Sequence, residues 1–140
     1  MIGFIVSGHG RFASGITAAI ELIIGKQENY IAVDFPDGDT KTEIEKNMHE
    51  AIVSLDECEH IVIFCDLLSG SPFNTAIMEA MNSDKLSVIY GTNLGMLMES
   101  LMNRNMGFSK EDIVNKAVET GKECIGRFEY KEIDDDDEFN

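Results

Sequence analysis

One histidine and one aspartate stand where two apolar segments of the chain end. His9 follows the apolar residues FIV and lies between two glycines in the stretch SGHG. Asp66 follows the apolar segment HIVIFC, and Ser71 opens the stretch SPFNTA shortly afterwards. A histidine, a carboxylate and the start of a helix form a set that can carry a phosphoryl group, because each residue type has a distinct role in that chemistry.

The roles follow from the chemistry of imidazole and phosphate. A neutral imidazole is nucleophilic at one ring nitrogen, and a carboxylate that accepts a hydrogen bond from the other nitrogen determines which one. A phosphoryl group brings about −1.5 to −2 charges, and a helix that starts near Ser71 offers it free N–H groups and a positive dipole end. We therefore predict His9, Asp66 and Ser71 as catalytic residues. The predicted phosphoryl-binding positions are Gly10, Gly70, Ser71 and Pro72.

Each feature also has an ordinary structural interpretation. His9 can lie in a turn that faces solvent, Asp66 can cap a loop, and Gly-Ser-Pro is a good helix start without any chemistry. His49 and His60 have no carboxylate at a useful spacing in the sequence, so we interpret both as surface or boundary residues. Two further acids lie in a turn at the rim of the predicted site, where a minor role stays open: Asp37 and Asp39.

Four short apolar segments are typical of strands in a parallel sheet that is covered on both faces, because their apolar residues are nearly continuous rather than alternating. They span residues 2–7, 30–34, 60–65 and 86–90. Helical periodicity between and after them predicts helices over residues 12–24, 41–55, 94–103 and 110–124, with one more starting near residue 71. The expected N-caps are Thr40 or Asp39, Ser71 with Pro72 in the first helical position, and Ser109.

This alternation predicts an α/β fold with a doubly wound, mostly parallel four-stranded sheet and helices on both faces. The later stretch IGRFEYKEI is a possible C-terminal edge strand. In such a fold the residues that follow each strand meet at one edge of the sheet, where ligands bind. His9, Asp66 and the Gly70–Ser71 step are therefore expected to converge.

Composition narrows the classes of partner. The net charge of −15 argues against a nucleic acid or an anionic membrane surface and favours a basic protein partner. Three cysteines without CxxC or metal-ligand spacing indicate reduced thiols, and we expect no metal and no cofactor. Without a signal peptide or a long apolar segment, the protein is expected to be soluble, cytoplasmic and not embedded in a membrane. We expect one domain over residues 1–130 and an acidic C-terminal tail over residues 131–140.

Four stretches in this order and spacing, SGHG, GKQENYIAVDFPDGD, CDLLSGSPFNTA and GTNLGMLMESLMNR, carry a family resemblance over residues 1–125. Together they resemble the IIA component of the mannose-type branch of the bacterial phosphoenolpyruvate-dependent sugar phosphotransferase system (PTS). The resemblance implies a phosphocarrier that is phosphorylated on His9, with Asp66 orienting the ring and Ser71 assisting. It also implies the phosphocarrier protein HPr as donor, a IIB component as acceptor, and a homodimer whose sheet edges involve a C-terminal strand. Ser69 departs from the family pattern, in which many members have a second glycine.

Other functions fit less well. A related phosphocarrier that feeds a dihydroxyacetone kinase is the nearest alternative, although GSPFN and GTNLGML favour the sugar-transport branch. A regulatory binding module of the same fold would lack His9 or Asp66. An aspartate-phosphorylated receiver domain needs paired acids after its first strand, and a hydrolase needs a serine with a base placed for it. We therefore expect a separate soluble carrier of the phosphotransferase class.

Overall fold

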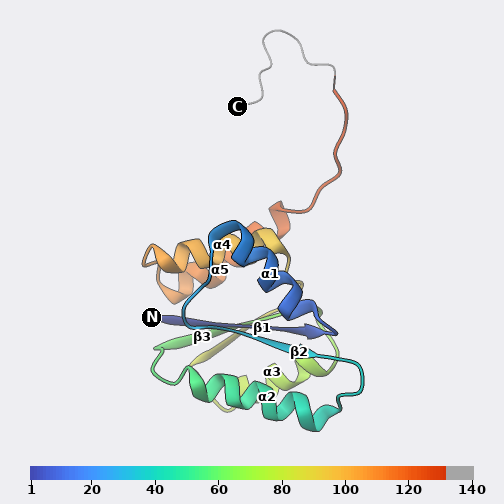
Figure 1. Ribbon diagram of the computed structural model, residues 1–140. Helices are drawn as coiled ribbons and strands as arrows, with labels where there is room; N and C mark the ends of the chain where they lie inside the picture. The colour runs from blue at the N-terminus through green and yellow to red at the C-terminus, as the bar shows by residue number, and fades with distance from the viewer. Residues whose placement is uncertain (132–140) are drawn as a thin grey trace.

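The four strands of the central sheet run parallel to one another (Figure 1). The computed structural model describes residues 1–131. Its strands are β1 (Ile2–His9), β2 (Tyr30–Phe35), β3 (His60–Cys65) and β4 (Leu86–Ile89). Their order across the sheet is β2-β1-β3-β4. The predicted doubly wound parallel sheet is therefore confirmed.

The strand order places a topological switch point between β1 and β3. From β1 the chain moves outward to β2, and it then crosses to β3 on the other side of β1. The connections that follow β1 and β3 consequently leave the sheet toward opposite faces, α1 above and α3 below in Figure 1. A crevice forms at the carboxyl ends of strands where such connections part, and ligands of α/β proteins bind there.

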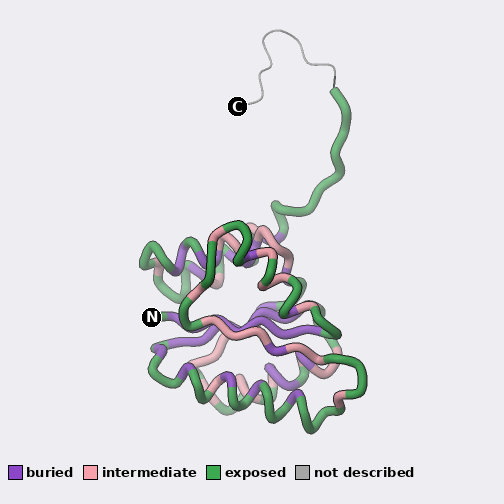
Figure 2. Tube along the Cα trace, in the orientation of Figure 1, coloured by how far each residue is buried: buried purple, intermediate pink, exposed green. Residues whose placement is uncertain are grey.

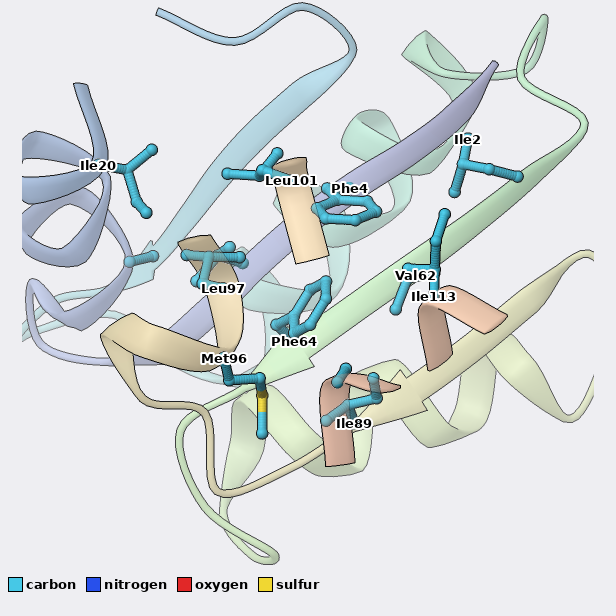
Figure 3. Packing of buried hydrophobic residues seen from close by; sticks show 13 residues of the cluster. Ile2, Phe4, Ile20, Val62, Phe64, Ile89, Met96, Leu97, Leu101 and Ile113 are labelled. Atoms are coloured by element: carbon cyan, nitrogen blue, oxygen red, sulfur yellow. The ribbon is translucent and has the colours of Figure 1, made fainter. Parts of the chain in front are cut away.

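Five helices cover the two faces of the sheet. Helices α1 (Phe12–Ile24), α4 (Leu94–Asn105) and α5 (Lys110–Glu123) lie on one face, whereas α2 (Lys41–Ser54) and α3 (Ser71–Ala80) lie on the other (Figure 1). The buried residues accordingly concentrate along the strands and the inner helix faces (Figure 2). On the first face, the rings of Phe4 and Phe64 pack with centroids 5.0 Å apart, in a cluster that includes Leu97 (Figure 3). This packing and the strand pairing hold β1 and β3 side by side.

Strand β1 extends beyond its predicted end. Its pairing with β3 stops at Ser7 opposite Cys65, but its pairing with β2 continues to His9 opposite Phe35. His9 is therefore the last residue of a strand and not a residue of a turn, because β2 supplies hydrogen-bonding partners for longer than β3 does. Gly10 prolongs this contact through an antiparallel bridge to Phe35.

Helix α3 begins differently from the prediction. Gly70 is its N-cap residue, with φ 91° and ψ 173°, and Ser71 is already the first helical residue. The prediction of Ser71 as N-cap is wrong by one position, because a glycine with positive φ lets the chain turn into the helix one residue earlier. Elsewhere Thr40 rather than Asp39 caps α2. The prediction for Ser109 is confirmed, since its hydroxyl accepts from the amide of Asp112.

The C-terminal segment contains no strand over the residues that the structure describes. Residues 125–131 have no regular structure and leave the domain after α5 (Figure 1). The C-terminal edge strand predicted for IGRFEYKEI is therefore absent from the described part of that stretch, where no residue pairs with a strand. The acidic residues of the predicted tail, 132–138, lie outside the described residues. Across residues 1–131, none of the helices combines the length and the apolar character needed to cross a membrane.

Candidate functional site

The predicted histidine and aspartate meet at the switch point. His9 ends β1, and Asp66 directly follows β3. The Nδ1 atom of His9 lies 2.8 Å from Oδ2 of Asp66. The aspartate side chain is 12% exposed and the histidine side chain 44% exposed. The carboxylate is thus held inside the crevice while the ring remains open to a partner.

Hydrogen bonds to Asp66 determine the tautomer of the His9 ring. The Oδ2 atom of Asp66 also accepts from the backbone amide of His9 at 2.9 Å, and the Oδ1 atom of Asp66 accepts from the amide of Leu67 at 2.9 Å. An ionised carboxylate only accepts, so Nδ1 must carry the proton in this contact. The lone pair is then on Nε2, which is the nucleophilic nitrogen of the ring.

The Nε2 edge of the ring lies against the backbone at the start of α3. A Cβ atom built on Gly70 would lie 2.5 Å from Nε2 and 2.6 Å from Cε1 of His9, closer than real contacts allow. The amide of Asn74 donates to the carbonyl of Gly70, so the amides of Ser71 and Phe73 before it have no acceptor within the helix. The nucleophilic nitrogen therefore lies beside a helix N-terminus, where a phosphoryl group finds N–H donors and a favourable dipole.

A second glycine allows the carboxylate to come this close. A Cβ atom at Gly8 would lie 2.6 Å from the ring of Phe12 and 2.8 Å from the carboxyl carbon of Asp66. The backbone of β1 thus has no side chain where Asp66 needs room. Gly8 has no positive φ, so a glycine is needed at this position for the close approach alone.

The remaining predicted residues surround the pair. Ser71 lies in the first turn of α3, at a groove between α2 and α3, and no hydrogen bond joins it to His9 within residues 1–131. Pro72 is buried and has no N–H. The amide of Gly10 donates to the carbonyl of Phe35 at 2.8 Å, so this amide is not free to bind a ligand. The space where a side chain of residue 10 would lie is open. Their roles in phosphoryl binding stay predictions.

Phe35 is a site residue that sequence reasoning missed. Its ring packs edge-on against that of His9, with centroids 6.2 Å apart and planes at 74°. It reaches the site because β1 and β2 pair up to their last residues. The only signal in the sequence is an aromatic residue at the end of the second apolar segment, just before the Pro-Asp-Gly turn.

Two other histidines and a cysteine have surroundings of their own. His60 is buried, its Nε2 atom contacts the hydroxyl of Ser87 at 2.7 Å, and burial lowers its pKa. His49 is a surface residue as predicted, but it does have a carboxylate partner, Glu79 on α3 at 3.0 Å. Burial and the charge of Asp66 raise the pKa of the Cys65 thiol to about 12. Cys65 is therefore not a nucleophile at neutral pH.

This geometry is accompanied by a match to a known family. The family model EIIA-man, described as the PTS system fructose IIA component, matches residues 3–118. The chain belongs to this family. This match confirms the mannose-type resemblance found in the sequence.

Individual relatives agree with the family match. The IIA chain is 30% identical over 133 residues to the mannose-specific EIIAB component of Escherichia coli K12, covering 95% of this chain and 41% of that protein. It thus spans about two fifths of the length of that relative. It is also 30% identical over 124 residues to the sorbose-specific EIIA component of Klebsiella pneumoniae, covering 89% and 90% of the two chains.

Solved structures show the same fold. The EIIA component from Streptococcus agalactiae superimposes with a TM-score of 0.83 at 30% identity, covering 91% of this IIA chain and 97% of that one. A mannose/sorbose-specific IIA subunit from Enterococcus faecalis gives a TM-score of 0.84 at 20% identity, covering 94% of this chain and 98% of that one. At that identity the likeness shows the fold alone.

Proposed function

We propose that this IIA component is a cytoplasmic phosphocarrier that accepts a phosphoryl group from phosphorylated HPr on Nε2 of His9 and passes it to a histidine of a IIB component. The observation that supports this most is the contact between Nδ1 of His9 and Asp66, which leaves Nε2 as the free nucleophile beside the start of α3. The family match supports the general role in sugar phosphotransfer.

The transfer exchanges one P–N bond for another. The lone pair of Nε2 attacks the phosphorus atom of the donor phosphohistidine, and the donor's P–N bond breaks with its electron pair returning to the donor ring. Positive charge develops on the His9 ring because Nδ1 keeps its proton, and the carboxylate of Asp66 stabilises that charge. Transfer to the IIB component follows the same path in reverse, with the IIB histidine as nucleophile.

The start of α3 stabilises the transferred group. Phosphoryl transfer passes through a loose transition state, so the protein contributes mainly positioning and electrostatic stabilisation. The amides of Ser71 and Phe73 and the dipole of α3 supply positive potential next to Nε2. The Ser71 hydroxyl can donate a further hydrogen bond to a phosphoryl oxygen.

The test of this function is phosphorylation by a reconstituted donor chain. With enzyme I, HPr and radiolabelled phosphoenolpyruvate, the wild-type protein should take up one acid-labile phosphoryl group. His9→Ala should fold normally and take up none, whereas His49→Ala, the matched exposed histidine, should take up as much as the wild type. Peptide mapping that placed the label on His49, on His60 or on an aspartate would contradict the proposal.

We also propose that two copies of this chain form a homodimer through the C-terminal segment. Strand β4 is an edge of the sheet, and exposed strand edges are templates for pairing with another chain. A pocket of about 330 Å³ lies beside it, lined mostly by apolar residues such as Tyr90 and Val118, together with Lys122. Phe128 and Tyr130 are 85% and 86% exposed in a single chain, so a partner edge would give them a surface to cover.

The dimer can be tested by light scattering. The wild-type protein should have about twice the chain mass of 15.6 kDa at micromolar concentration. Replacing Phe128 and Tyr130 by serine should shift the mass toward a single chain, because their apolar surface no longer drives association. A monomeric wild type, or a dimer that both serines leave intact, would rule out this arrangement.

A further inference from the structure

The loop that joins β3 to α3 encloses the His9 ring from two sides. At its first residue, Asp66 binds Nδ1, and at its last residue, Gly70 packs against Nε2. Between them lie Leu67 and Leu68, which are 53% and 58% exposed. Two leucines are therefore exposed in a short loop whose ends both contact the reacting imidazole.

The backbone of this loop is fixed in place. The amide of Asp66 donates to the carbonyl of Ser7 at 3.2 Å, the amide of Leu67 donates to Oδ1 of Asp66, and the carbonyl of Gly70 accepts from Asn74 in α3. The leucine side chains are consequently displayed from a loop that is anchored at both ends. Preformed apolar groups of this kind lose little freedom on association, which favours their use as anchors in an interface.

Phosphoryl transfer between proteins requires a partner to cover this loop. The reacting atoms must come within about 3–3.5 Å of each other, so the protein surface around the partner's phosphohistidine lies directly over the residues that border Nε2. When the partner docks, the side chains of Leu67 and Leu68 are removed from contact with water. Apolar contacts at the centre of an interface, surrounded by a polar rim, contribute most of the binding free energy.

We propose that Leu67 and Leu68 form the apolar docking site for the phosphohistidine-bearing protein that loads His9. This inference rests on the proposed function. The partner should present apolar side chains next to its phosphohistidine and basic side chains further out. The basic rim follows from charge complementarity, because this chain has a net charge of −15 and the turn after Phe35 carries the exposed Asp37 and the half-buried Asp39.

The experiment compares a protein donor with a small donor. Rapid-quench transfer from phosphorylated HPr should show a second-order rate constant about tenfold or more below wild type in Leu67→Ser/Leu68→Ser. The rate constant at saturating donor should remain within about twofold. Phosphorylation by phosphoramidate, which needs no docking surface, should be unchanged.

Two controls separate docking from general effects. Ser69→Ala alters the same loop without removing apolar surface, and Leu22→Ser removes an 88% exposed leucine from the far half of α1. Both should transfer from phosphorylated HPr at the wild-type rate.

The outcomes that overturn the docking proposal differ from one that overturns the function. A double variant with the wild-type second-order rate constant would show that the leucines do not bind the donor. An equal loss with phosphoramidate would show that they shape the site itself, and a drop in mass by light scattering would show that a second copy of this chain covers them. If the wild-type protein accepts phosphoryl from neither donor, the proposed function fails and the docking site fails with it.

Discussion

Asp66→Asn should slow phosphoryl transfer from phosphorylated HPr to His9 by about 10²–10⁴-fold while the protein stays folded. The carboxylate accepts three hydrogen bonds, from Nδ1 and the amide of His9 on Oδ2 and from the amide of Leu67 on Oδ1. An asparagine has one carbonyl oxygen and one NH₂ group, so it cannot accept on both sides. Whichever way the amide turns, one N–H donor faces another.

The orientation that satisfies Leu67 is the damaging one for catalysis. It directs the NH₂ group toward Nδ1, which stabilises the tautomer with the proton on Nε2 and removes the nucleophilic lone pair. The charge that stabilises the phosphorylated ring is lost in both orientations. Each orientation leaves one backbone amide, that of Leu67 or that of His9, without its acceptor, so the cost in the free energy of unfolding should be about 1 kcal/mol.

Single-turnover transfer measured beside thermal unfolding distinguishes the two effects. A large loss of rate with a small loss of stability supports the orienting role of Asp66. Wild-type transfer rates in Asp66→Asn would mean that this carboxylate does not orient the nucleophile.

Gly70→Ala should reduce transfer by about a hundredfold or more, because the new methyl group would lie 2.5 Å from Nε2 and would displace the ring from the start of α3. The backbone at Gly70, with φ 91° and ψ 173°, also lies in a region that is nearly confined to glycine. The strain should cost about 1–3 kcal/mol in the free energy of unfolding.

The chain contains a matched control for the strain. Gly25, the C-cap of α1, has φ 84° and ψ 177°, and a Cβ atom there would meet nothing within 4 Å. Gly25→Ala should therefore lose a similar amount of stability and keep wild-type transfer. If both variants transfer equally well, contact between Gly70 and the His9 ring is not needed for the reaction.

The sequence predicts the fold well because the apolar segments of a doubly covered sheet are nearly continuous and the helices between them are strongly periodic. The ends of the strands are less predictable. His9 looks like a turn residue between two glycines, yet it ends β1 because β2 pairs with it to the last residue. That register depends on contacts between distant parts of the chain and leaves no local signal.

The candidate site was likewise only partly predictable from the sequence. The approach of His9 to Asp66 follows from topology alone, since the carboxyl ends of β1 and β3 must be neighbours at the switch point. The close approach of Gly70 to Nε2 depends on the positive φ of Gly70 and on the exact position of the ring. Neither can be predicted from the spacing of residues in the sequence. The partner of His49 was missed for a related reason, because Glu79 comes from a second helix thirty residues further along the chain.

We propose that Asp66 holds Nδ1 of His9 and leaves Nε2 to carry the phosphoryl group. NMR of protein labelled at its histidine nitrogens, recorded before and after phosphorylation by HPr, reads both atoms directly. The geometry predicts a protonated Nδ1 in both states and a new bond from Nε2 to phosphorus. A phosphoryl group on Nδ1 of His9, or a His9 ring whose Nδ1 is unprotonated before the reaction, would show that Asp66 does not determine the reacting nitrogen.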